Sequence, residues 1–164
     1  MNPRFHTMLA AFFLALAVHA GAPVDPELQR LTANLQNAKT QTEMNLASEK
    51  LAQFWNARLT AIEAKIEGRL SIRERNRFAD SKERWRSYRA TEVSLRAGLY
   101  EDGSMRPLLL NAAYTQITEH RVSELESLFR DALAGRGEPG GPASGSQPIR
   151  SETNSTSSAA GSRR

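Results

Sequence analysis

Apolar residues recur at steps of three and four along the central part of the chain, between residues 25 and 134. This spacing places them on one face of an α-helix. The clearest run consists of Met44, Ala47, Leu51, Trp55, Leu59, Ile62 and Ile66. No segment alternates apolar and polar residues for long enough to predict a strand. We therefore predict an all-α fold, a small bundle of three long helices and one short N-terminal helix.

Two pairs of residues have the spacing of a capping box, in which a hydroxyl and a glutamate three positions later satisfy free backbone groups at a helix start. Thr40 and Glu43 predict a long helix that ends at Gly68. Ser71 and Glu74 predict another, which ends at the Asp102-Gly103-Ser104 segment. Its apolar face is expected to contain Phe78, Trp85, Tyr88, Leu95 and Leu99.

Proline marks the first turn of the two other helices. Asp25 and Pro26 begin the short helix, whose apolar residues are Leu28, Leu31, Leu35 and Ala38. Pro107 begins the last helix. Its expected buried stripe, interrupted by the charge of Arg121, is Leu110, Tyr114, Ile117, Arg121, Leu125, Leu128 and Ala132.

The two ends of the chain differ from this helical region. Residues 1–20 have the pattern of a secretory signal peptide: Arg4, the apolar run 8–18, and small or apolar residues before a cut after Ala20. A membrane anchor is the alternative, but the run is about half the roughly 20 residues that a span needs. Residues 135–164 contain six Gly, three Pro and seven Ser, which predicts a disordered tail. The expected organisation is a signal peptide (1–20), a helical domain (25–134) and a tail (135–164).

Few residues in this chain are suited to catalysis. It has no cysteine, and His120 is the only histidine after the predicted signal peptide. Glu63 and Glu67 share a helix face, which a solvated surface explains without a site. We therefore expect no enzyme activity, no cofactor and no metal ion.

Positive charge is concentrated between Lys65 and Arg96, where ten Lys and Arg face five Asp and Glu. Arg-rich helices bind phosphates in nucleic acids, but a predicted export signal makes nucleic acid an unexpected partner. An anionic lipid, an envelope glycan or an acidic protein fits the predicted location better, and a solvated helix face explains the charge equally well. The candidate binding residues are Arg73, Arg77 and Arg84.

Four short motifs occur in a recognisable order. They are Gln41-Thr42-Glu43-Met44-Asn45, then Trp85 with Tyr88 and Arg89, then Gly103-Ser104, then Ile117 and Thr118 with Arg121 and Leu125. Together they resemble the LprI-like lysozyme-inhibitor domain family, small exported helical proteins of bacteria. The resemblance extends from about Leu35 to Leu128.

The chain departs from that family in one respect. Members usually carry four cysteines, and the corresponding positions here are Leu35, Ala47, Val93 and Ala113. All four residues are apolar, so the resemblance implies a variant in which core packing replaces disulfides.

The resemblance implies a periplasmic or secreted protein that binds a protein partner, lysozyme in the first place, without chemistry. Common animal lysozymes are cationic, so the basic helix would oppose that encounter. The candidate surfaces are the turn Glu101-Asp102-Gly103-Ser104 and the polar helix start at residues 40–45. The alternative is an envelope module that binds an anionic lipid, a glycan or an acidic protein through the Arg-rich helix.

Overall fold

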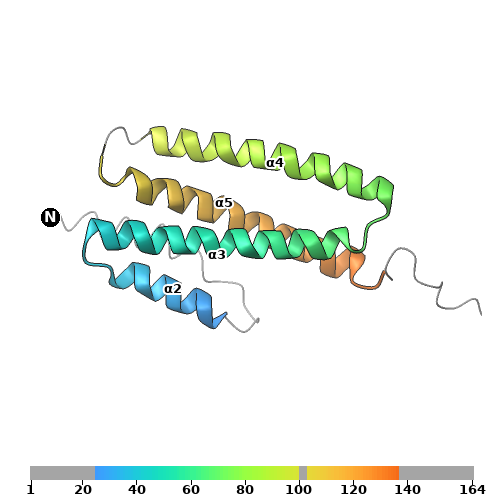
Figure 1. The fold of residues 1–164 in the computed structure, drawn as a ribbon, viewed down its shortest axis with the longest axis horizontal. Coiled ribbons are helices and arrows are strands. Elements are labelled where there is room, and N and C mark those ends of the chain that lie inside the picture. Colours follow the sequence, from blue (N-terminus) through green and yellow to red (C-terminus); the bar gives the residue numbers. More distant parts are fainter. Residues whose placement is uncertain (1–24, 100–102, 137–164) are drawn as a thin grey trace, which may run out of the picture.

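The computed structural model describes residues 25–99 and 103–136. Within these ranges it contains helices and no strand, which confirms the all-α prediction. The elements are α2 (Pro26–Asn37), α3 (Gln41–Glu67), α4 (Ile72–Gly98), α5 (Arg106–Leu128) and the π-helical turn η2 (Phe129–Leu133). The long helices α3, α4 and α5 lie side by side, with the short α2 against α3 (Figure 1).

Both predicted capping boxes are present. The Thr40 hydroxyl accepts a hydrogen bond from the backbone N–H of Glu43 (3.2 Å), and the Glu43 carboxylate accepts one from the N–H of Thr40 (3.0 Å). Ser71 and Glu74 make the same exchange at the start of α4 (3.4 and 2.9 Å). The starts of α3 and α4 are therefore set by groups within four residues of each start.

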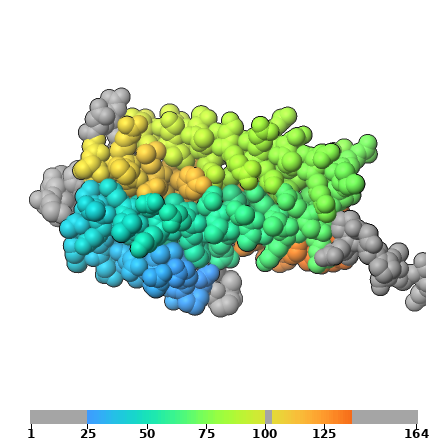
Figure 2. Space-filling model, viewed as in Figure 1, coloured from blue at the N-terminus to red at the C-terminus, as the bar shows by residue number. Residues whose placement is uncertain are grey.

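The core lies between α3 and α5, which make the most extensive contact and run in the same direction (Figure 1). Its larger cluster consists of Trp55, Leu59, Ile62, Ile66, Leu70, Val122, Leu125 and Leu133. A second cluster joins α2 to the starts of α3 and α5 and consists of Leu31, Leu35, Ala47, Leu51 and Leu108. In the space-filling view α4 forms one edge of the molecule (Figure 2).

The predicted apolar face of α4 is wrong at three of its five residues. Tyr88, Leu95 and Leu99 are 52, 58 and 74% exposed, and Ala97 is the only fully buried residue of the helix. The other two predicted residues, Phe78 and Trp85, are partly buried on the inner side, together with long cationic side chains. The prediction failed because α4 packs mainly against α5, where guanidinium groups supply the aromatic contact and the hydrogen bonds that cross the interface. The helix also ends at Gly98, before the predicted stop at residues 102–104.

The buried stripe of α5 differs from the prediction at its C-terminal end. Leu125 is buried, but Leu128 is exposed and Ala132 is exposed as well. The chain continues into η2, where the N–H of Ala134 donates to the carbonyl of Phe129 (2.7 Å), and Leu133 enters the larger core cluster.

Three of the four positions where the family carries cysteine are buried. Leu35 and Ala47 lie in the same core cluster, and Ala113 is also buried, whereas Val93 is half-buried. Apolar packing thus occupies these positions. The predicted signal peptide, the turn residues Glu101 and Asp102, and nearly all of the predicted tail lie outside the described residues. None of the helices in the described part of the chain is long and apolar enough to cross a membrane.

Candidate functional site

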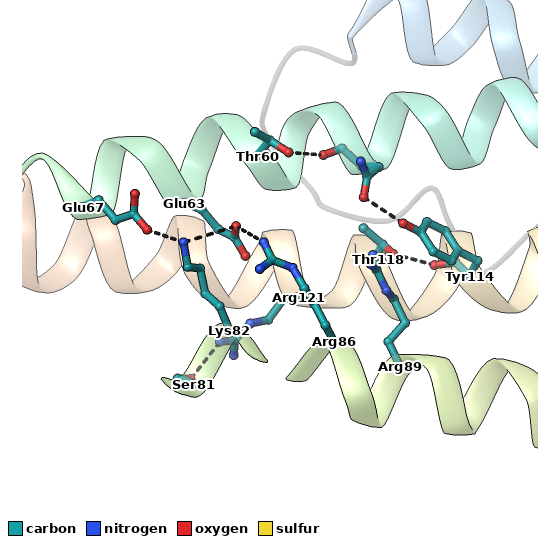
Figure 3. Close-up of polar contacts among 11 residues, drawn as sticks. Thr60, Glu63, Glu67, Ser81, Lys82, Arg86, Arg89, Tyr114, Thr118 and Arg121 are labelled. Atoms are coloured by element: carbon teal, nitrogen blue, oxygen red, sulfur yellow. Dashed lines mark hydrogen bonds and ion pairs between the residues drawn. The ribbon is translucent and has the colours of Figure 1, made fainter. Parts of the chain in front are cut away.

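Arg89 lies between two aromatic rings at the interface of α4 and α5. Its guanidinium carbon is 4.6 Å from the ring centroid of Trp85 and 4.1 Å from that of Tyr114. One of its nitrogens also donates to the hydroxyl of Thr118, at 3.1 Å (Figure 3). Burial lowers the pKa of Arg89 below its ordinary value, although the group keeps its charge in any accessible pH range. Cation–π contacts therefore replace an acidic partner for this arginine.

The residues that contact Arg89 from α5 are themselves held by hydrogen bonds. Thr118, which is fully buried, donates to the carbonyl of Tyr114 (2.7 Å) and accepts from Arg89. The Tyr114 hydroxyl donates to the side-chain oxygen of Asn56 on α3 (2.7 Å). Arg89 is thereby linked through α5 to α3.

Arg121 of α5 is a second arginine close to Trp85. Its guanidinium carbon is 5.8 Å from the Trp85 ring centroid, and it donates to the hydroxyl of Ser81 on α4 (3.4 Å). Trp85, Arg89, Tyr114, Thr118 and Arg121 form what we call the arginine–aromatic cluster. All of these except Tyr114 belong to the motifs recognised in the sequence. Leu125, which shares a motif with Thr118 and Arg121, lies in the core. Tyr88, by contrast, is exposed and has no part in the cluster.

A second polar group joins α4 directly to α3. Glu63 is only 5% exposed, and its carboxylate lies 2.9 Å from a nitrogen of Arg86 and 4.0 Å from Nζ of Lys82. Lys82 also pairs with Glu67 (Figure 3). The expectation that these glutamates lie on a solvated surface is wrong for Glu63, because two cations reach it across the helix interface.

The polar motif at the start of α3 has a structural role as well. The side chain of Gln41 donates to the side-chain oxygen of Asn45 (2.9 Å). The backbone carbonyl of Asn45 accepts from the hydroxyl of Ser48 (2.8 Å). Asn111 of α5 donates to the Ser48 hydroxyl (3.1 Å). Glu43 serves in the capping box, and Met44 packs against the second core cluster.

The second predicted surface, the turn before α5, lies at the same end of the bundle as the start of α3 (Figure 1). Gly103 and Ser104 are exposed there, and the Gly103 carbonyl accepts from the N–H of Arg106 (3.0 Å). Because Glu101 and Asp102 lie outside the described residues, their part in this surface stays a prediction.

The arginines of α4 divide into two sets. Arg75, Arg86, Arg89 and Arg96 each bond to a group elsewhere in the fold. Arg73, Arg77 and Arg84 are exposed and make no bond to any residue in the described ranges. The structure leaves free the same three arginines that the sequence suggested as binding residues.

Sequence reasoning missed several polar residues, among them Asn56, Asn111 and Glu119. Burial raises the pKa of Glu119 to about 7. A glutamate near a helical stripe is common, so no sequence signal marked it. His120 is exposed and lies 3.1 Å from Glu124. Among the residues the structure describes, no three His, Asp or Glu side chains are arranged to hold a metal ion.

Comparison with known protein families gives a match to "Lysozyme inhibitor LprI" over residues 32–125. The chain belongs to the LprI lysozyme-inhibitor family. The matched segment runs from the middle of α2 almost to the end of α5, so it contains the arginine–aromatic cluster and the polar start of α3. No curated protein and no solved structure matches the sequence.

In this LprI-family chain, most of the recognised motif residues face inward. Trp85, Arg89, Thr118 and Leu125 hold helices together, and Asn45 links α3 to α5 through Ser48. The motif residues that remain exposed are Thr42, Glu43, Tyr88, Gly103 and Ser104. The family motif therefore mainly stabilises the fold. It does not identify the partner, whose binding site has to be sought on the rest of the surface.

Proposed function

We propose that this LprI-family protein is exported to the periplasm or beyond the cell and binds a protein partner, lysozyme, without catalysing a reaction. The observation that carries the proposal is the family match, which extends over α3, α4 and nearly all of α5. Inhibition then consists of occupying the partner's surface, so neither a cofactor nor a catalytic group is needed.

The binding surface we propose is the end of the bundle where α3 begins and where the turn before α5 lies. Gly103 and Ser104 are exposed at that turn, and Glu101 and Asp102 precede them in the sequence. Acidic residues suit a cationic lysozyme, whereas the free arginines of α4 would repel it. Lysozyme is therefore expected to approach this end and to avoid α4.

The test is lysis of bacterial cell walls by lysozyme in the presence of the purified protein. We expect slower lysis, and we expect the double substitution Glu101→Gln and Asp102→Asn to weaken the effect. The matched control is Asp80→Asn with Glu83→Gln, which removes two exposed acids from α4. Undiminished lysis at high micromolar protein would refute the function, and equal weakening by the control pair would refute the proposed surface.

Export has a separate test. The N-terminus of the protein recovered from the envelope or the medium should be Gly21, which follows a cut after Ala20. Mass spectrometry of the intact protein distinguishes this from a retained N-terminal segment.

A further inference from the structure

The outer face of α4 carries a single row of unpartnered side chains. Its members follow one another at steps of three, four and seven residues, which keeps them on one side of a helix. They are Arg73, Arg77, Asp80, Arg84, Tyr88, Leu95 and, at the helix cap, Leu99. All of these side chains are exposed, and none of them is bonded to another described residue. We call this row the outer row of α4.

The row changes character along its length. Its first half has three arginines and one aspartate, a net charge of +2. Its second half has three large apolar or aromatic side chains that are at least half exposed. Of the other acids of α4, Glu74 is paired with Arg136 and Glu92 with Arg96, whereas Glu83 is exposed and its side chain bonds to no other described residue.

The size and shape of the row restrict its ligand. From Arg73 to Leu99 it extends for about 39 Å at the rise of an α-helix, which is too long for a small molecule to contact both halves. The opposite side of α4 packs on α5, so the row is a convex ridge at the edge of the molecule (Figures 1 and 2). A protein partner would need a long groove, whereas a deformable surface accommodates a ridge directly.

We propose that the outer row of α4 docks the protein on an anionic lipid surface. Arg73, Arg77 and Arg84 would contact lipid phosphates, for which a guanidinium fork is well suited. Tyr88 would lie at the level of the headgroups, where amphipathic rings are favoured, and Leu95 and Leu99 would enter the boundary with the acyl chains. This docking uses other residues than the proposed lysozyme surface, which lies at the start of α3 and the turn before α5.

The experiment measures co-sedimentation of the full chain with vesicles of phosphatidylglycerol mixed with phosphatidylcholine, and with vesicles of phosphatidylcholine alone. We expect binding to the anionic vesicles that falls as salt is raised, because exposed charges are screened. Arg73→Gln, Arg77→Gln and Arg84→Gln together should lower the partition coefficient by about 100-fold, since each basic residue near an anionic surface contributes about fivefold. The variant with Arg73→Lys, Arg77→Lys and Arg84→Lys should keep most of the binding.

The matched control for charge replaces Lys50, Lys65 and Arg106 by glutamine. These residues lie on α3 and α5, and their side chains are exposed and make no bond to another described residue. We expect less than a threefold change, because they do not lie on the row. For the apolar half, Leu95→Ser with Leu99→Ser should lower binding at least fivefold, and the control pair is Leu46→Ser with Leu128→Ser, exposed leucines on other helices. Helix content measured by circular dichroism confirms that each variant is folded.

Three results would overturn the proposal: no binding to anionic vesicles, equal losses in the row variants and their controls, or binding that is insensitive to salt and to the arginines. All variants keep the same chain ends. Binding through residues 1–24 would therefore not respond to the arginine substitutions, which is the third of these results. Row-dependent binding of an acidic protein or DNA without vesicle binding would also refute the lipid assignment. The lysis assay, run on the arginine variants, should show inhibition at least as strong as that of the wild type, which separates this proposal from the proposed function.

Discussion

Replacing Arg89 by alanine should loosen α4 from the rest of the bundle. The helix has a single fully buried residue, so it depends on a few interfacial contacts. Arg89 makes two of them, to Tyr114 and Thr118, and also lies against Trp85 of its own helix. Each cation–π contact at a partly desolvated site contributes about 0.5–2 kcal/mol. The hydrogen bond from a charged donor contributes about 1.5–3 kcal/mol.

These contributions do not add in full. Burial of the guanidinium has a cost, which the lowered pKa of Arg89 reflects, and its removal offsets part of the loss. Thr118 also keeps its own bond to the Tyr114 carbonyl, so no buried hydroxyl is left without a partner. We therefore expect Arg89→Ala to lower the free energy of unfolding by about 2–3 kcal/mol, and Arg89→Lys by about 1–2 kcal/mol.

Urea unfolding followed by circular dichroism measures this difference. Arg84→Ala is the matched control, because Arg84 is exposed on the same helix and should cost less than about 0.5 kcal/mol. Hydrogen exchange of α4 amides should increase more than that of α3 amides, since Arg89 anchors α4 to α5 and the core between α3 and α5 stays intact. If Arg89→Ala and Arg84→Ala cost the same, the cluster does not hold α4 in place and the reasoning is refuted.

Three further predictions concern buried polar groups. Glu119 has a pKa raised from 4.5 to about 7, so its contribution to stability should be greatest below pH 4.5 and decline as the pH rises toward 7. Allowing for its partial exposure, wild type should lose about 1–2 kcal/mol relative to Glu119→Gln over this range, and parallel pH profiles of the two proteins would contradict the assignment. Glu63→Gln should cost about 1–3 kcal/mol because it removes the charge that Arg86 and Lys82 share, whereas the exposed Glu49→Gln should cost little in the same urea titration. Thr115 is buried with a hydroxyl that has no partner among the described residues, so Thr115→Val should raise the melting temperature, whereas Thr118→Val, which removes two hydrogen bonds, should lower it.

Local chemistry made the helices predictable. The two capping boxes and the prolines at Pro26 and Pro107 act on backbone groups within one turn, so their effect is already present in the order of residues. The family resemblance could be recognised for the same reason, since its motifs consist of short runs. The apolar substitutes at Leu35 and Ala47 were also predicted to pack, and they lie in one core cluster.

The side of α4 that faces the bundle could not be predicted in this way. Tyr88 and Arg89 are neighbours, and hydropathy alone places the tyrosine inside and the arginine in water. The reverse holds, because Trp85 and Tyr114 supply aromatic faces for the guanidinium and Thr118 an acceptor. Two of these three groups are on another helix, 25 and 29 residues further along the chain.

The sequence by itself determined the helical class, the helix starts, the concentration of positive charge on α4 and membership of the LprI family. The tertiary structure alone decided which charges are engaged and which are free. Arg86 and Glu63 are 23 residues apart, and Arg89 and Thr118 are 29 apart. Hydrogen bonds within a helix act between residues about four apart, whereas these contacts exist only after the helices have packed, so no local pattern shows which groups Arg86 and Arg89 bind.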